Sequence, residues 1–84
     1  MAVAGFVAPY LLGGTTRFVE AAMTLPGTEL ALITCEPEER VPAGLRRGLA
    51  AHWRIDDPLD AGQIAGAVHA LGEHLGPVQR LLAA

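Results

Sequence analysis

Lysine and serine are both absent from this sequence of 84 residues, and all six of its cationic side chains are arginines. Without lysine, the chain has neither the phosphate-binding lysine of a P-loop nor an amine for a Schiff base. Without serine, it has no serine nucleophile for its three histidines to activate. These absences exclude several common enzyme classes before any motif is considered.

Cysteine and membrane signals are equally sparse. Cys35 is the only cysteine, so the chain forms no internal disulfide, which favours a reducing compartment. The apolar stretch at residues 1–14 has no preceding basic residue, is interrupted by Pro9, and is shorter than the roughly 20 residues that span a bilayer. We therefore expect a cytoplasmic protein that does not contact a membrane.

The charge balance argues against nucleic acid as a partner. Nine acidic residues outweigh six basic ones, giving a net charge of -3, whereas duplex binding requires a clustered basic face. Arg46 and Arg47 are the only adjacent cations, and we interpret them as solvated helix surface. The length predicts one domain over residues 1–84, and its 51% hydrophobic content indicates either an all-aliphatic core or a surface made for a partner.

Short apolar runs alternate with helical patterns along the whole chain. Strands are predicted at residues 3–8, 29–34, 53–55 and 78–84, separated by helices at 15–25, from Pro42 onward, and from Asp60 to Leu75. In the first helix, Phe18, Ala22 and Leu25 form an apolar stripe. In the last, Asp60 and Gln63 have the spacing of a capping box, and Gly76 provides a left-handed end.

This β-α-β-α-β-α-β order predicts an α/β fold with three layers. Four parallel strands, in the order 2-1-3-4, should lie between helices on both faces, because the strands are too apolar for a sheet with one wet face. Ligands of such sheets bind beyond the carboxyl ends of the strands where the strand order reverses, which this order places between the first and third strands.

Four residues at that edge are candidates for an anion-binding loop. Gly13, Gly14, Thr15 and Thr16 would turn backbone N–H groups and a helix N-terminus toward an anion, although they match no established glycine-rich phosphate motif. A threonine N-cap after a flexible turn explains the same residues without a ligand, and this is the interpretation we favour.

Other reactive side chains give no catalytic or metal site. Asp56 and Asp57 could bind a divalent cation or orient a base, but adjacent acids also precede helices for capping, which we favour. His69 and His74 are five residues apart, so they cannot chelate one ion on a helix. Cys35 is interpreted as a small core residue that lies close to the functional edge.

Several segments together resemble a known domain. These are "APYLL", "TRFVEAA", "LPG", "LITCEPEER", "HWRIDD" and "LGPVQRLL", which cover most of the chain. They are similar to the N-terminal pre-ATP-grasp domain of bacterial ATP-grasp proteins, including carboxylate–amine ligases and biotin-carboxylase-like enzymes. The resemblance implies a Rossmann-like unit that packs against ATP-grasp domains and helps to shape the acceptor-substrate side of their active site, where Asp56 and Asp57 are candidate acids.

The resemblance also implies where the chemistry lies. ATP-grasp enzymes bind ATP and magnesium on a separate, larger domain, so this chain by itself should hold no cofactor and carry no catalytic residue. We expect a domain fragment or natural remnant whose parent is an ATP-dependent ligase and whose partners are the ATP-grasp domains of that parent. The alternative is a free-standing interaction module without enzymatic activity that forms a homodimer through an uncovered apolar surface.

Overall fold

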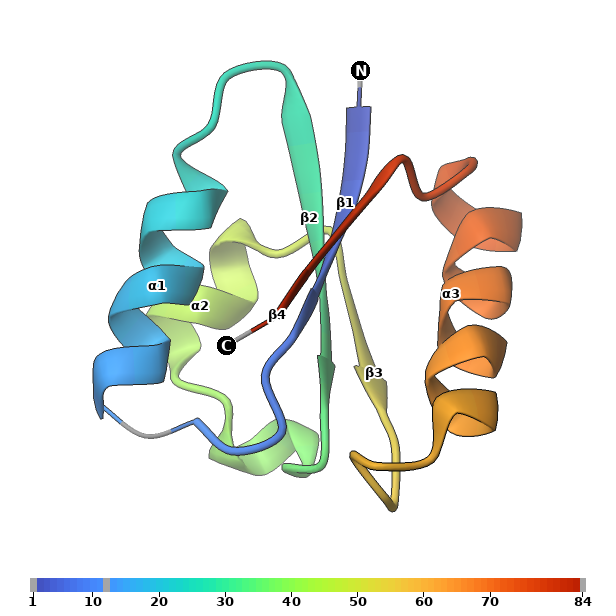
Figure 1. The fold of residues 1–84 in the computed structure, drawn as a ribbon. Helices are drawn as coiled ribbons and strands as arrows, with labels where there is room; N and C mark the ends of the chain where they lie inside the picture. The colour runs from blue at the N-terminus through green and yellow to red at the C-terminus, as the bar shows by residue number, and fades with distance from the viewer. Residues whose placement is uncertain (1, 12, 84) are drawn as a thin grey trace.

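The computed structural model describes residues 2–11 and 13–83 as four strands, three α-helices and one short 3-10 helix (Figure 1). In chain order these are β1 (Ala2–Val7), α1 (Gly13–Met23), β2 (Thr28–Thr34), η1 (Glu38–Arg40), α2 (Ala43–Gly48), β3 (Ala51–Arg54), α3 (Ala61–Leu75) and β4 (Arg80–Ala83). All the strand pairs are parallel, and helices cover both faces of the sheet. The predicted three-layer α/β fold is confirmed.

The predicted strand order 2-1-3-4 is wrong, because the sheet runs β3-β2-β1-β4. The long apolar strands β1 and β2 take the two central positions and pair along six residues. β3 carries the exposed side chains of Trp53 and Arg54, which suit an edge and would be buried in the third position. The order therefore reverses between β1 and β4, so this is the topological switch point.

Right-handed crossovers distribute the helices over the two faces. The chain moves in one direction from β1 through β2 to β3, which places α1 and α2 on the same face, and then crosses back to β4 with α3 on the other. Phe6, Leu30 and Leu32 pack under α1 and α2 together with Val19 and Leu45. Ile33 and Val7 pack under α3 with Ala67 and Leu71. Two apolar cores, aliphatic apart from Phe6, thus bury both faces of β1 and β2.

Helix α1 differs from its prediction in its start and in its buried face. It begins at Gly13, so Thr15 lies inside the first turn, and the predicted threonine N-cap is wrong. Val19 and Ala22 face the core, whereas 67% of Phe18 is exposed and Leu25 follows the end of the helix with 49% exposed. The predicted stripe followed hydrophobicity, but the sheet buries the smaller side chains and leaves Phe18 outside.

Both ends of α3 form as the sequence predicts. Asp60 is the N-cap residue, and its Oδ1 accepts hydrogen bonds from the backbone N–H groups of Gly62 at 2.9 Å and Gln63 at 3.3 Å. Gly76 ends the helix with a positive φ of 96°, as predicted, but its ψ of 170° is extended and not the left-handed helical value, a combination that glycine alone adopts readily. Ile64, Leu71 and Leu75 face the sheet.

Candidate functional site

The carboxyl ends of β1, β2 and β3 are joined by backbone and side-chain hydrogen bonds. The carbonyl of Pro9, just after β1, accepts the N–H of Cys35 and the hydroxyl of Thr34, both at 3.1 Å. The same hydroxyl oxygen accepts the N–H of Glu36 at 3.2 Å. Thr34 is fully buried, so these two bonds satisfy a hydroxyl that would otherwise be costly to bury. Hydrogen bonds therefore connect the segments that follow β1 and β2 at this edge.

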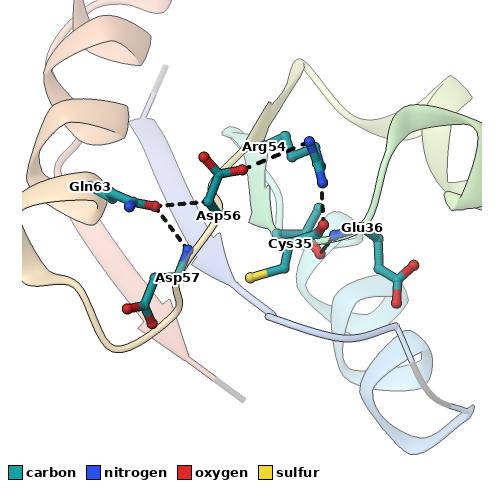
Figure 2. A network of polar contacts seen from close by, with 7 residues as sticks. Cys35, Glu36, Arg54, Asp56, Asp57 and Gln63 are labelled. Carbon is teal, nitrogen blue, oxygen red and sulfur yellow. Dashed lines mark hydrogen bonds and ion pairs between the residues drawn. The ribbon is translucent and has the colours of Figure 1, made fainter.

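A short polar network extends from this edge to the end of β3 (Figure 2). The Nε of Arg54 donates to the carbonyl of Cys35 at 3.2 Å, and its guanidinium lies 3.8 Å from the carboxylate of Asp56. Both side chains of this ion pair are largely exposed, so its contribution to stability is small. Its geometric effect is to link the ends of β2 and β3.

Cys35 belongs to this network through its backbone carbonyl, whereas its thiol side chain is half-buried against the α3 core. Burial raises its pKa above the ordinary value of 9.0, the carboxylate of Asp57 raises it further, and Arg54 acts in the opposite direction. At neutral pH the group is thus a protonated thiol, which is a poor nucleophile and a poor metal ligand. This agrees with the interpretation of Cys35 as a packing residue near the edge.

Gln63 organises the loop between β3 and α3. Its Oε1 accepts the backbone N–H groups of Asp56 at 2.8 Å and Asp57 at 2.9 Å, and its Nε2 donates to the second carboxylate oxygen of Asp60 at 3.3 Å. In an ordinary capping box this glutamine would return to the backbone of the N-cap residue. Here the side chain is directed to the preceding loop and fixes the direction of both acids (Figure 2).

The two candidate acids have different surroundings. Asp57 accepts the N–H of Leu59 at 2.9 Å in a local turn, and Asp56 faces Arg54. The residues that the structure describes contain no group of three or more potential ligands that could hold a metal ion. Asp56 and Asp57 are instead a pair of exposed carboxylates on a loop that Gln63 holds by hydrogen bonds at the carboxyl edge of the sheet.

The glycine-rich loop lies at the same edge of the sheet but on the other face. Gly13 and Gly14 open α1, which packs on the face opposite α3, and the loop that carries Asp56 and Asp57 leads into α3 (Figure 1). A Cβ added at Gly14 would meet nothing within 4 Å, so packing within the chain does not require glycine there. Leu12 lies outside the described residues. The structure therefore does not join Gly13–Thr16 and the acidic pair into one site.

The histidines lie away from this edge. On the exposed face of α3, the Nε2 of His69 lies 3.0 Å from a carboxylate oxygen of Glu73, four residues further along the helix. His52 is half-buried in β3, and its Nε2 is a buried atom that makes no hydrogen bond with the described residues. These positions assign no catalytic role to any histidine.

These features define a Rossmann-like α/β domain with a hydrogen-bonded carboxyl edge and a topological switch point beside β4. No protein-family model, curated protein or solved structure matches the chain. Among the described residues, no helix is both long and apolar enough to cross a membrane. The class of the fold is thus established, and the particular family stays a proposal.

Sequence reasoning missed two residues of the edge network. The sequence places Arg54 in a strand and Gln63 in a cap, but Arg54 contacts the carbonyl of Cys35, 19 residues earlier, and Gln63 reaches back seven and six residues to the backbone of Asp56 and Asp57. The available signal was Arg54 two residues before Asp56 at the end of a short strand, a position from which a guanidinium can reach both a carboxylate and a neighbouring strand end.

Proposed function

We propose that this chain is the N-terminal, substrate-side domain of an ATP-grasp ligase of the carboxylate–amine or carboxylase-like type. In this role it packs against the ATP-grasp domains of its parent and presents the loop of Asp56 and Asp57 to the acceptor substrate. ATP and magnesium bind to the ATP-grasp domains.

The observation that carries the proposal is that β4 is an edge strand with an exposed apolar side chain. This strand pairs with β1 on one side, lies at the edge of the sheet, and leaves Leu81 51% exposed on the α3 face. An apolar edge strand beside a topological switch point is suited to contact with another domain, because an open edge otherwise invites aggregation. The resemblance of the sequence to pre-ATP-grasp domains indicates that the contacting domain is an ATP-grasp domain.

The chemistry of the carboxyl edge is consistent with a supporting role. Cys35 is held as a protonated thiol, and Gln63 is occupied by two backbone N–H groups of the loop. The exposed carboxylates of Asp56 and Asp57 remain accessible, and they can orient an amine or another cationic acceptor through charge-assisted hydrogen bonds.

The first test is the reading frame that contains this sequence. We expect it to encode ATP-grasp domains after residue 84, and we expect the whole protein to form ADP or AMP from ATP only when an acceptor is present. Deleting residues 1–84 from that protein should leave ATP binding in place and abolish transfer to the acceptor. A frame that stops at Ala84, or tight binding of MgATP by residues 1–84 alone in calorimetry, would contradict the proposal.

The second test concerns the acids. In the whole protein, Asp57→Asn and Asp56→Asn should raise KM for the acceptor and leave KM for ATP unchanged, because the two substrates are held by different domains. Asp60→Asn is the matched control, since asparagine also caps helices well and the residue faces α3. An equal effect of all three substitutions would show that the loop has only a structural role.

A further inference from the structure

A cavity lies between the edge strand β3 and the first half of α3. Its volume is about 430 Å³, a size typical of small-molecule sites, and its walls include Trp53, Ile55, Asp56, Gly66 and Ala67. In the described part of the chain, β3 pairs with β2 alone, so no further strand closes the outer side of the cavity. A ligand can therefore enter from solvent along the edge of the sheet.

Trp53 and Gly66 give the cavity an aromatic wall and open space. Trp53 pairs in register with Ile33, which packs under α3, so the alternation of side chains along a strand puts the indole ring on the α3 face. There the tryptophan is 37% exposed. A Cβ added at Gly66 would meet nothing within 4 Å, so there is room over this turn of α3 for an apolar group.

Asp56 is the one acid among the described residues that line the cavity. Its side chain is 83% exposed, and the Arg54 guanidinium lies 3.8 Å from its carboxylate, which is longer than a hydrogen bond. The Nε of Arg54 donates instead to the carbonyl of Cys35. The carboxylate of Asp56 can therefore accept hydrogen bonds from a ligand without breaking one within the chain.

An aromatic ring beside a carboxylate selects a cation. An indole ring attracts a positive charge over its face, and a carboxylate adds a charge-assisted hydrogen bond to an N–H donor. Arg54 is the one cation of the described wall, and it leaves β3 on the face opposite Trp53, toward Cys35 (Figure 2). An anion in the cavity would meet the charges of Asp56 and the adjacent Asp57, so the wall disfavours it.

We propose that this cavity binds a small organic cation, a primary ammonium group carried on an apolar carbon body. The ammonium group lies against the carboxylate of Asp56 and the ring of Trp53, and the apolar body occupies the space over Gly66. This inference deepens the proposed function and rests on it only for the role of the cation, which is then the acceptor substrate. Binding itself is a property of the 84-residue chain and is measured without ATP.

Other hollows of the described surface carry less. Arg46 and Arg47 border one beside Glu38, but all three side chains are exposed and α2 is only six residues long. His69 and Glu73 border another, where the two side chains already contact each other. Neither hollow combines open space with a charge that lacks a nearby partner.

The fluorescence of Trp53, the only tryptophan, measures binding directly. Titration of the 84-residue chain with phenethylamine at neutral pH should change the emission and saturate in the millimolar range, after correction for the quenching of free tryptophan amide. The uncharged phenethyl alcohol should bind at least about 10-fold more weakly, because it lacks the charge-assisted bond. The anion phenylpropionate should not bind. Absence of saturation by the amine, equal binding of the alcohol, or binding of the anion would overturn the proposal.

Two glycines of α3 provide a matched pair of variants. Gly66→Leu should fill the cavity and abolish binding of phenethylamine, whereas Gly72→Leu, where a Cβ also meets nothing within 4 Å, should leave it unchanged. Both substitutions introduce a better helix former, so both variants should fold, which circular dichroism checks. An equal loss of binding in the two variants would contradict the assigned location.

The charged residues give a second pair with opposite signs. Asp56→Asn should raise the dissociation constant by about 5-fold or more, because the bond to the ammonium loses its charge, and Asp60→Asn should have a much smaller effect. Arg54→Gln should lower the dissociation constant, since it removes the cation that competes for Asp56. Weaker binding by Arg54→Gln would overturn the proposal. Amine binding by a chain whose reading frame encodes no ATP-grasp domain would support this cavity and contradict the proposed function alone.

Discussion

Gln63 shows how much of the carboxyl edge depends on one uncharged side chain. Its amide oxygen accepts two successive backbone N–H groups, and its amide nitrogen donates to the N-cap residue of α3. The sequence indicated a link between Asp60 and Gln63 but not the contacts to Asp56 and Asp57. Spacing along a helix predicts contacts within that helix, whereas the position of a preceding loop depends on the strand that delivers it.

Replacing Gln63 should therefore destabilise the loop between β3 and α3 more than the partial exposure of this side chain suggests. We expect Gln63→Ala to lower the free energy of unfolding by about 1–2 kcal/mol, since two accepted hydrogen bonds are lost in a place that water reaches only in part. Gln79→Ala is the control, because this exposed glutamine makes no side-chain hydrogen bond with the described residues. Urea denaturation of both variants gives the comparison. Equal stability would show that water replaces the amide without cost.

The thiol of Cys35 gives a prediction about pH. Because burial and Asp57 raise its pKa above 9.0, alkylation by iodoacetamide at pH 7.5 should be slower than that of a free cysteine, and its rate should still be rising with pH above pH 9. Asp57→Asn should move this profile to lower pH, since it removes a carboxylate that disfavours the thiolate. Asp60→Asn provides the control. A profile that matches a free cysteine peptide would contradict the assigned environment.

The same shift has a consequence for stability. The thiol is harder to ionise in the folded chain than in the unfolded chain, so its contribution to stability is complete below the unfolded pKa. The contribution is lost as the pH rises through the higher folded pKa. Cys35→Ala should remove this part of the alkaline loss.

At the scale of elements, the short helix α2 depends on a close approach to α1. A Cβ at Gly48 would overlap the Cε of Met23, whereas a Cβ at Gly44, in the first turn of the same helix, would meet nothing within 4 Å. The two glycines therefore have different reasons to be present. The sequence alone could not separate them, because the position of Met23 relative to Gly48 follows from how α1 and α2 pack.

This difference gives a paired experiment. Gly48→Ala should destabilise the fold by no more than about 1 kcal/mol, because the new Cβ meets the terminal methyl of the flexible Met23 side chain, which can move aside. Gly44→Ala should be neutral or stabilise by up to about 1 kcal/mol, because alanine favours helix. Thermal unfolding of both variants tests this, and combining Gly48→Ala with Met23→Ala should recover part of the loss. Similar effects of the two alanines would refute the packing argument.

The elements also show which local signals are reliable. The strands of continuous apolar residues and both ends of α3 were predicted to within a few residues, because aliphatic runs, an aspartate N-cap and a glycine with positive φ act through nearby atoms. The start and the buried face of α1 were predicted wrongly. Phe18 is more hydrophobic than Val19, but Val19 and Ala22 are the α1 residues that pack in the core over β1 and β2.

At the scale of the whole molecule, stability should be distributed unevenly over the sheet. β2 pairs with β1 and β3 and is buried on both faces, whereas β4 pairs with β1 alone and exposes Leu81. We expect amide protons of β4 to exchange through local opening, and those of β2 only through global unfolding.

Native-state hydrogen exchange measures this difference. Exchange of β4 amides as slow as those of β2 would mean that β4 opens only together with the central sheet.

Residue patterns were enough to predict the class of fold, the number of strands, their parallel direction and the ends of α3, because each follows from apolar runs, connection lengths and capping over short distances. The strand order β3-β2-β1-β4, the switch point beside β4, the network around Arg54 and Gln63, and the exposure of Phe18 became visible only in the folded chain. The strand order depends on the burial of all four strands together, and the network and the exposure of Phe18 depend on how helices and loops pack on that sheet. A pattern within one short segment therefore cannot predict them.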